Sequence, residues 1–376
     1  MKQSTAIVKG PLTQRLLAAT GALILAGCVA GPEGATAPSV GSLDGARVAL
    51  PTDGGERELV FLAGRTDAGD LAAFKAAAPN VRYVVPESDD EALRLAPDVH
   101  GADSRRCTPE FLAAASQLAW IQVPSAGVDR LLGRQDIRNR KEIVLTNMQG
   151  VHGPAIAEHV FGMLLNLTRN VGHYQAPSRR GTWDRGGAER DAIVLSGRTM
   201  LVVGLGGIGS EVARRAHGFD MKVLATRRSR KERPAYVDRQ GTAQDLDAML
   251  PLADVVVLAV PLTEETEGMI NARTLELMKP GAYLVNIARG KVVDTDALVT
   301  ALESGKLAGA CLDVTDPEPL PADSPLWEMP NVVITPHVAS RAALTGERRK
   351  DLFLSNLRRF GAGEPLLNVV DLSVGY

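Results

Sequence analysis

Cysteine and aromatic residues are scarce in this chain. Its three cysteines, Cys28, Cys107 and Cys311, lie far apart in the sequence. An odd number at such spacing predicts neither a disulfide framework nor a zinc site, and we expect no bound metal. Aromatic residues make up 4% of the chain, which is too few for the stacking platforms that bind single-stranded nucleic acid.

A surplus of either charge is also missing. The formal net charge of the 376 residues is -2 at pH 7, so the sequence predicts no nucleic-acid partner. Hydrophobic residues make up 45% and charged residues 23% of the chain. These values are typical of a globular protein, and the length allows two domains with hydrophobic cores.

One uncharged stretch stands out near the N-terminus. Residues 16–27 carry no charge and follow the basic residues Lys2, Lys9 and Arg15. The stretch is short for a helix that spans a bilayer, whereas its length and flanks are typical of a secretory signal peptide. It ends in Leu25-Ala26-Gly27-Cys28, which resembles a bacterial lipoprotein signal, in which the cysteine is lipidated and becomes the new N-terminus.

This leader predicts a protein attached to the cell envelope by lipid. We expect residues 1–27 to be a signal peptide, Cys28 to be lipidated, and residues 28–46 to be a flexible linker rich in Gly, Ala, Pro and Ser. Two alternatives stay open. In the first, the stretch is an apolar N-terminal helix. In the second, it is an extension from a wrongly assigned start, and the protein is cytoplasmic.

Short apolar strands alternate with helical patterns from residue 58 onward. In the first half we expect strands at residues 59–63, 81–85, 118–123 and 142–146, and helices at residues 68–77 and 109–116. Such alternation predicts a parallel sheet flanked by helices. An almost uncharged helix is expected at residues 154–169, where apolar residues on nearly all sides indicate burial between domains or subunits. A loop is expected around Gly181-Thr182-Trp183.

A turn of small residues follows the expected strand at residues 118–123. Ser125, Ala126 and Gly127 lie in this turn, where several backbone N–H groups are exposed and can bind an anion. An ordinary turn between a strand and a helix is the alternative.

The second half begins with a glycine-rich turn. Gly204, Gly206 and Gly209 follow an apolar strand at residues 199–203 and open a helix at residues 208–217. In a dinucleotide-binding motif the first glycine allows the tight turn, the second lets a pyrophosphate approach, and the third lets the helix pack on the strand. The N–H groups at the start of the helix then face the phosphates. A purely structural glycine turn is the alternative.

Six strands in this half fit a doubly wound dinucleotide-binding sheet. They are expected at residues 199–203, 222–225, 255–260, 282–287, 308–312 and 332–335, with helices at 208–217, 243–250, 272–278, 295–303 and 344–360. In such sheets ligands bind beyond the carboxyl ends of the strands. The residues that follow each strand are therefore the candidates for a site.

The second of these strands ends without a carboxylate. Enzymes that use NAD usually place Asp or Glu there, on the ribose 2′-hydroxyl. Here Arg227, Arg228 and Ser229 follow the strand, and Asp220 lies before it, at the wrong end. Two arginines would attract a 2′-phosphate. The sequence therefore favours NADP(H), with an exposed basic turn as the alternative.

Three side chains suited to hydride transfer follow the last three strands. They are Arg289, Glu318 and His337. Reduction of a 2-keto acid needs a cation that holds the carboxylate and polarises the carbonyl, and arginine does so in a planar fork. It also needs a proton donor, which histidine supplies near neutral pH, and a carboxylate beside it keeps the imidazolium available. Taken singly, each residue is as easily a surface or structural residue.

The segments around these residues resemble the D-isomer-specific 2-hydroxyacid dehydrogenases. The similar segments are Asn286–Asp294, Leu312–Leu320 and Thr335–Ser340. The resemblance extends over about residues 58–370. It implies that Arg289 orients the substrate, that His337 is the acid/base and that Glu318 tunes His337. It also implies that Asp313 contacts the nicotinamide carboxamide.

The same resemblance implies an α/β fold with two Rossmann-like domains. Both domains would have doubly wound parallel sheets, with the active site in a cleft between them. The substrate domain is expected at residues 47–148 and 338–376, and the NAD(P)-binding domain at residues 149–337. Members of the family are usually homodimers through the cofactor domain, so a homodimer is expected here.

The expected site residues fall into four sets. The amides of Ser125, Ala126 and Gly127, together with Arg289, would bind the substrate. The cofactor would contact Gly204, Gly206, Gly207, Ile208, Gly209, Arg227, Arg228, Ser229, Val260, Pro261, Ile287, Ala288, Arg289, Asp313 and His337. Asn147, Gly150 and Glu158 fall at the hinge and crossover-helix positions. Val99, His100 and Trp327 are candidates for lining the pocket, although His100 fits a polar loop better.

The sequence therefore predicts an oxidoreductase that transfers a hydride between NAD(P)H and a 2-keto acid or D-2-hydroxy acid. It does not specify the side chain of that acid. A lipid anchor conflicts with this activity, because free nicotinamide cofactor is found in the cytoplasm. Three alternatives stay open: an exported enzyme with trapped cofactor, a cytoplasmic enzyme with an inactive leader, or an anchored dinucleotide-binding sensor without turnover.

Overall fold

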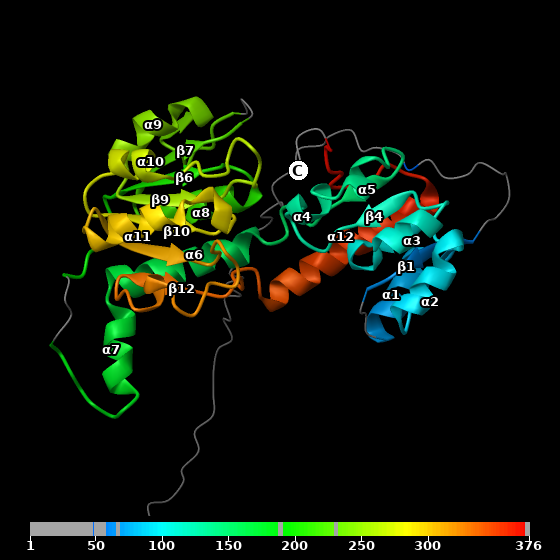
Figure 1. The fold of residues 1–376 in the computed structure, drawn as a ribbon, viewed down its shortest axis with the longest axis horizontal. Coiled ribbons are helices and arrows are strands. Elements are labelled where there is room, and N and C mark those ends of the chain that lie inside the picture. The colour runs from blue at the N-terminus through cyan, green and yellow to red at the C-terminus, as the bar shows by residue number, and fades with distance from the viewer. Residues whose placement is uncertain (1–47, 49–57, 65–67, 187–190, 229–231, 373–376) are drawn as a thin grey trace, which may run out of the picture. The chain divides into compact units, whose positions relative to one another are not determined.

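Short runs of β-branched and other apolar residues form two parallel sheets, one in each half of the chain. The computed structural model describes residue 48 and residues 58–64, 68–186, 191–228 and 232–372. The segment expected to be a leader and linker, with Cys28, lies outside these ranges. Figure 1 shows helices packed against both sheets, and the expected α/β class with two parallel sheets is confirmed.

The first sheet has five strands in the order β2-β1-β3-β4-β5. The strands are β1 (Leu59–Leu62), β2 (Val81–Val84), β3 (Gly101–Asp103), β4 (Trp120–Gln122) and β5 (Val144–Thr146). The helices are α1 (Ala68–Ala77), α2 (Asp89–Leu95), α3 (Pro109–Ala114), α4 (Asp129–Leu132) and α5 (Gln135–Arg138). All four strand pairings are parallel.

Strand β3 and the helices α2, α4 and α5 were not expected from the sequence. β3 lacks apolar alternation, and a Cβ on Gly101 would lie 2.7 Å from the Phe61 ring, so glycine permits the close packing there. α2 carries a signal that was overlooked. Ser88 accepts a hydrogen bond from the backbone N–H of Glu91 at 3.2 Å, the Ser-x-x-Glu pattern that begins many helices.

The second sheet has seven parallel strands in the order β12-β11-β10-β9-β6-β7-β8. They are β6 (Thr199–Val203), β7 (Lys222–Thr226), β8 (Arg239–Gly241), β9 (Val255–Leu258), β10 (Ala282–Asn286), β11 (Leu307–Leu312) and β12 (Val332–Ile334). The order reverses between β6 and β9, which makes this sheet doubly wound. The six expected strands are present, and β8 is an additional polar edge strand that apolar patterning does not reveal.

Helices cover both faces of the second sheet. They include α8 (Gly207–Gly218), α9 (Leu246–Met249), α10 (Ala272–Leu277) and α11 (Thr295–Glu303). The helix expected at residues 243–250 is present as a run of helical turns, in which the short α9 lies between two 3₁₀ turns. Every residue of β9 has 0% exposure, with one hydrophobic cluster on each face of the sheet. Burial on both faces explains why these strands are continuous apolar runs.

Helix α6 (Gly153–Thr168) packs on the second sheet and against α8. Val160, Phe161 and Leu164 are buried in the same cluster as the β6 side chains. A Cβ on Gly153 would lie 3.1 Å from the carbonyl oxygen of Gly207, so the two helices approach closely at their N-termini. Within the single chain Gly162 is exposed and the helix is buried along one face, so its expected burial between domains or subunits stays a prediction.

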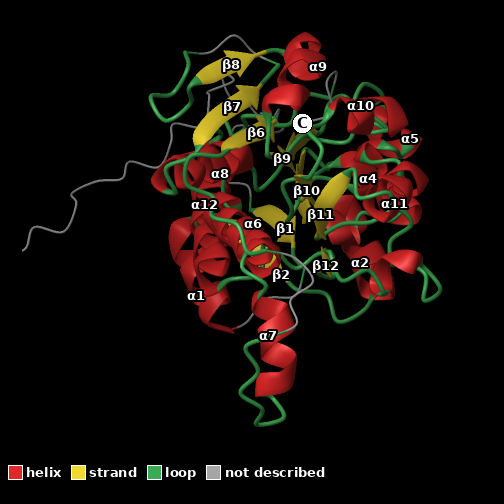
Figure 2. Cartoon of the chain, turned by 90° about the vertical axis from the view of Figure 1, so that its left-hand side faces the viewer, coloured by secondary structure: helices red, strands yellow, loops and turns green. Residues whose placement is uncertain are grey.

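Helix α7 (Val171–Ser178) lies where no helix was expected. None of its residues is buried, and Val171 is 52% exposed. Figure 1 and Figure 2 show α7 standing out from the sheet that α6 covers. It contacts α6 but buries no residue, so its apolar residues show no helical period and the sequence pattern gave no signal.

Helix α12 (Ala343–Ala362) carries the chain back to the first sheet. Phe353 and Phe360 are buried, with ring centroids 6.0 Å and 5.0 Å from that of Trp120. Beyond α12, Val369 pairs with Thr146 of β5. The C-terminal segment therefore completes the core of the N-terminal sheet.

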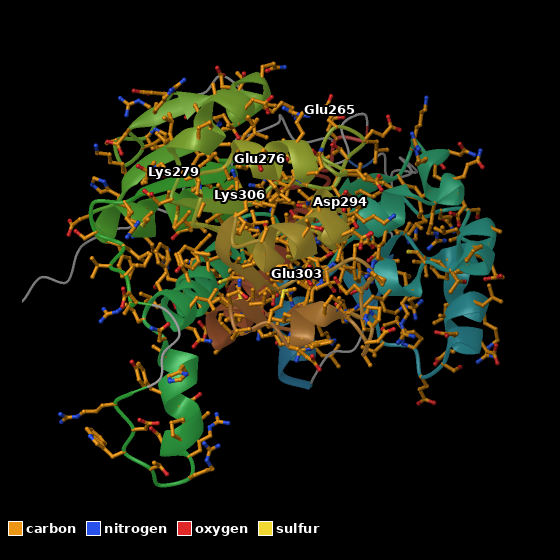
Figure 3. All side chains as sticks on the ribbon, turned by 60° about the vertical axis from the view of Figure 1, so that its left-hand side comes forward. Glu265, Glu276, Lys279, Asp294, Glu303 and Lys306 are labelled. Atoms are coloured by element: carbon orange, nitrogen blue, oxygen red, sulfur yellow. The ribbon has the colours of Figure 1, made fainter. Side chains whose placement is uncertain are left out.

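Charged residues pair with one another at the edge of the second sheet where the strands begin. Lys279 lies 3.1 Å from Asp254, and Lys306 donates to the carbonyl oxygen of Glu276 at 2.7 Å. Figure 3 labels Lys279, Glu276 and Lys306 on this part of the surface. Partly exposed pairs of this kind contribute little stability. The residues suited to chemistry lie at the opposite edge, where the strands end.

Within the residues that the structure describes, no helix is both long and apolar enough to cross a membrane.

Candidate active site

The glycine-rich turn joins β6 to α8 through backbone contacts that exclude side chains. Gly204 has a φ of 101°, in the left-handed region that favours glycine. A Cβ on Gly204 would lie 2.6 Å from the carbonyl oxygen of Ala259, and a Cβ on Gly209 would lie 2.0 Å from that of Gly204. The fold of the turn therefore requires glycine at its first and third motif positions.

The second glycine of the motif leaves room for a ligand. Gly206 is the N-cap of α8, and no side chain caps this helix. A Cβ on Gly206 would have no neighbour within 4 Å. The first N–H groups of a helix have no partner inside it, and they favour an anion at that end. This cradle fits the pyrophosphate of a dinucleotide.

We expect Gly209→Ala to damage both the fold and the cradle. Its methyl group meets a backbone oxygen that cannot turn away, so the free energy of unfolding should fall by about 1–3 kcal/mol. Affinity for NADPH should fall with it. Urea unfolding and fluorescence titration with NADPH measure the two effects. Gly218→Ala in the same helix is the matched control, because a Cβ there meets nothing within 4 Å. Equal stability and equal NADPH affinity in the two variants would contradict the assignment of this turn as the phosphate cradle.

Basic residues follow β7, where a ribose would lie in a doubly wound sheet. Arg227 is half-buried, and its Nε atom is buried without a hydrogen-bond partner among the described residues. Arg228 is exposed. Ser229, expected to bind the cofactor, lies outside the described residues. A buried N–H without a partner is costly, and a phosphate oxygen from a ligand would satisfy it.

Arg289 follows β10 in a turn that Asn286 holds. The buried Asn286 side chain accepts from the N–H of Ala288 at 3.0 Å and donates to the carbonyl oxygen of Arg289 at 3.0 Å. A Cβ on Gly290 would lie 1.9 Å from the carbonyl oxygen of Thr315, so the turn packs directly on the segment that follows β11. This fixes the backbone of Arg289 without using its guanidinium.

The guanidinium of Arg289 has a carboxylate partner that sequence reasoning missed. Its Nε and Nη2 atoms lie 3.2 Å and 3.0 Å from Oδ1 of Asp129, and Nη1 donates to the carbonyl oxygen of Ala288 at 2.7 Å. A Cβ on Gly127 would lie 1.7 Å from Nη2. Arg289 therefore lies directly on the turn expected to bind the substrate carboxylate. A guanidinium has five N–H donors, so two remain for a ligand.

The turn at residues 125–127 is held from the other side by Asn147. The Asn147 side chain donates to the carbonyl oxygen of Ala126 at 3.0 Å, and the N–H of Met148 donates to the carbonyl oxygen of Ser125 at 2.9 Å. The Ser125 hydroxyl donates to the carbonyl oxygen of Gly127 at 2.7 Å. With its carbonyl groups engaged, the turn retains N–H groups suited to an anion.

His337 and Glu318 form a pair. Nδ1 of His337 lies 2.9 Å from Oε1 of Glu318, and both side chains are partly exposed. A carboxylate that accepts from Nδ1 fixes the ring and leaves Nε2 for a substrate. The structure thus brings together two of the three residues expected to act, while Arg289 lies at the end of β10 in the same sheet.

The segment expected to be a hinge contains a buried imidazole. His152, the N-cap of α6, accepts at Nε2 from Nε and Nη2 of Arg349, 3.1 Å and 2.9 Å away. Burial, together with the Arg349 charge, lowers the pKa of His152 to about 4. The ring is therefore neutral at pH 7 and joins the start of α6 to α12. Nearby Gly150 has a φ of 86°.

The remaining expected residues differ in burial. Ile287 and Ala288 are buried, Ile208 and Val260 are half-buried, and Pro261 is exposed. Glu158 is an exposed partner of Arg215 at 3.0 Å. The expectation that Val99 and His100 line a pocket is wrong, because they are 0% and 2% exposed. His100 lies in the bend before β3, as expected for a loop residue, and its Nδ1 accepts from the N–H of Val60 at 3.2 Å. Trp327 is 51% exposed and donates to the carbonyl oxygen of Pro321.

Known proteins are similar to this chain in sequence and in fold. Residues 161–339 match the family model described as D-isomer specific 2-hydroxyacid dehydrogenase, NAD binding domain. A glyoxylate reductase of Pyrococcus furiosus is 40% identical over 268 residues, which are 69% of this chain and 78% of that protein.

Solved structures show the same fold. A D-isomer specific 2-hydroxyacid dehydrogenase family protein from Aeromonas salmonicida is 37% identical with a TM-score of 0.73, and the match covers 84% of this chain and 99% of that one. An NADPH-dependent glyoxylate/hydroxypyruvate reductase from Sinorhizobium meliloti, solved with NADP and sulfate, is 27% identical with a TM-score of 0.70. That match covers 85% of this chain and 100% of the other.

Proposed function

Because the chain belongs to the D-isomer specific 2-hydroxyacid dehydrogenase family, we propose that it reduces a small 2-keto acid to the D-2-hydroxy acid with NADPH. The observation that carries this proposal is the contact of 2.9 Å between Nδ1 of His337 and Oε1 of Glu318. It pairs an acid/base group with its carboxylate at the edge of the sheet that also bears the glycine cradle. An exposed histidine without such a partner would not support a reaction of this kind.

Each of the three proposed catalytic residues has a separate task. Arg289 binds the substrate carboxylate and polarises the carbonyl with the N–H donors that Asp129 leaves unused. The amides of Ser125, Ala126 and Gly127 hold the same carboxylate. His337 gives its Nε2 proton to the carbonyl oxygen, while Glu318 orients the ring and stabilises its charged form. The nicotinamide supplies the hydride when it is bound.

The cradle at the start of α8 fits the cofactor pyrophosphate, held by Gly204, Gly206, Gly207, Ile208 and Gly209. Val260, Pro261, Ile287 and Ala288 follow the neighbouring strands and would contact the nicotinamide half. Asp313 would accept from its carboxamide, since Oδ2 of Asp313 takes one donor, the N–H of Ala339, among the described residues, and a carboxylate oxygen accepts more than one hydrogen bond.

NADP(H) is the preferred cofactor in this proposal. Replacing both Arg227 and Arg228 by alanine should raise the KM for NADPH about tenfold to a hundredfold, because a hydrogen bond to a charged group contributes about 1.5–3 kcal/mol. The KM for NADH should change little, because NADH lacks the 2′-phosphate. Steady-state kinetics with both cofactors measure this. A wild-type preference for NADH would overturn the assignment.

A substrate screen tests the proposed reaction. The purified full-length chain is assayed with glyoxylate, hydroxypyruvate and pyruvate, each with NADPH and with NADH, following absorbance of the reduced nicotinamide. We expect turnover with at least one acid. Tight binding of NADPH without turnover of any acid would favour the anchored sensor over the enzyme.

The domain organisation of the proposal follows the expected ranges. Residues 47–148 and 338–376 form the substrate domain, which the packing of α12 on the first sheet supports. Residues 149–337 form the NAD(P)-binding domain, which the packing of α6 on the second sheet supports.

Homodimer formation through the cofactor domain is part of the same proposal. The support lies in three exposed residues of the segment that follows α6. Val171 and Tyr174 of α7 are 52% and 37% exposed, and Trp183 is 86% exposed. Sedimentation equilibrium should give the mass of two chains, and a single-chain mass would contradict it.

Lipidation of Cys28 and a location in the cell envelope are further parts of the proposal. Their support is the sequence Leu25-Ala26-Gly27-Cys28 after a short apolar stretch. Fractionation of the native cells, followed by mass spectrometry of the N-terminal peptide, distinguishes this from a cytoplasmic enzyme with an inactive leader.

A further inference from the structure

The segment that carries His337 is held from behind by Asp313. We call residues 335–339 the acid loop. Its backbone donates three consecutive N–H groups to this one residue. The N–H of His337 donates to the Asp313 carbonyl oxygen at 2.8 Å. The N–H groups of Val338 and Ala339 donate to the carboxylate, at 2.9 Å and 3.1 Å.

These hydrogen bonds hold His337 in a sparsely populated backbone conformation. Its φ is 53°, in the left-handed region, where a non-glycine residue pays about 1–2 kcal/mol. The left-handed turn directs the next two N–H groups toward the carboxylate. The Asp313 carboxylate, 4% exposed, therefore decides where the His337 ring lies.

Two further side chains connect this carboxylate to helix α6. The Thr335 hydroxyl donates to Oδ1 of Asp313 at 2.7 Å, and Nε2 of His159 lies 2.9 Å from the same hydroxyl oxygen. A hydroxyl has a single hydrogen to donate. Because that hydrogen goes to the carboxylate, Thr335 accepts from His159, so Nε2 of His159 carries a hydrogen.

We propose that His159 is a positioning residue for His337, acting through Thr335 and the Asp313 carboxylate on the acid loop. The role rests on the proposed function, in which His337 is the acid/base. The hydrogen bond from His159 fixes the direction in which the Thr335 hydroxyl donates. The hydroxyl then fixes the position of the Asp313 carboxylate, which holds the acid loop.

The surroundings of Thr335 show why the hydroxyl needs this donor. Its oxygen also lies 3.6 Å from Sδ of Met163, a weak acceptor. Without the hydrogen bond from His159, the hydroxyl is free to rotate between this sulfur and Asp313. His159 is 26% exposed, so it is not a core residue whose main contribution is packing.

Two substitutions distinguish the effect of the His159 hydrogen bond from the effect of the volume that its ring fills. His159→Leu removes the donor and keeps an apolar side chain of moderate size. His159→Gln keeps an N–H donor of similar reach. His217→Leu is the matched control. It replaces the same residue type by leucine outside the site, because His217 is exposed near the end of α8.

We expect His159→Leu to lower kcat about tenfold, as the loss of one positioning hydrogen bond would. The KM for the keto acid should stay near wild type, because Arg289 is untouched. His159→Gln should recover most of kcat, and His217→Leu should behave as wild type. An unchanged kcat in His159→Leu, or no recovery with glutamine, would overturn the proposal.

A readout without turnover keeps this test independent of the proposed function. Amide hydrogen exchange of Val338 and Ala339 should be faster in His159→Leu than in wild type and in His159→Gln. Unchanged exchange would overturn the inference even in an active enzyme. If no keto acid is reduced but the exchange rates shift as expected, the proposed reaction is wrong and the positioning role of His159 in the acid loop still holds. Thr335→Val, which removes the relay hydroxyl, should show the same faster exchange.

Discussion

Replacing His337 by alanine should lower kcat about 10²–10⁴-fold, the usual contribution of a positioned general acid. The alkoxide that forms during hydride transfer then lacks its proton donor. Binding of NADPH should be retained, because the glycine cradle belongs to β6 and α8 rather than to the acid loop. Stopped-flow measurement of hydride transfer and fluorescence titration of NADPH report the two quantities separately.

The control for this variant concerns the backbone. Alanine at position 337 must adopt the φ of 53° that the acid loop imposes, whereas asparagine tolerates the left-handed region far better. His337→Asn should therefore fold as well as wild type and still lose kcat. Retained turnover in the asparagine variant would show that another group gives the proton, and the pairing with Glu318 would then be structural.

The fold could be predicted from sequence wherever strands are long and apolar. The buried strands β6, β9 and β10 appear as largely apolar runs because helices cover both of their faces. β3 and β8 could not be found, since a polar edge strand or a strand with glycine carries no such pattern. α7 could not be found either, because a helix that buries no residue has no apolar period to detect.

Some residues of the site could also be predicted from the sequence, and others could not. Arg289, Glu318 and His337 could be proposed because each follows a strand of one sheet, and such strand ends meet at the same edge. Asp129 and His159 could not be. Their part is to hold another residue, and a holding contact depends on three-dimensional proximity between segments up to 176 residues apart. The type and spacing of residues in the sequence do not encode it.

Arg289→Lys should lower kcat/KM about 10²–10³-fold, comparable to the loss of one donor that stabilises a developing oxyanion. Lysine keeps the charge but has one nitrogen. Arg289 uses Nε and Nη2 on Asp129 and Nη1 on Ala288 and still has two N–H groups for the substrate. A lysine ammonium can pair with Asp129 or with the substrate carboxylate, but it cannot fork between them.

The kinetic pattern separates this explanation from a loss of charge. Since arginine both binds the carboxylate and polarises the carbonyl, KM should rise and kcat should fall together, with NADPH affinity unchanged. Arg273→Lys is the matched control, because Arg273 pairs with Asp247 on the exposed surface of α10 and should tolerate the change. If Arg289→Lys raises KM alone, Arg289 only binds the acid, and polarisation of the carbonyl belongs to His337.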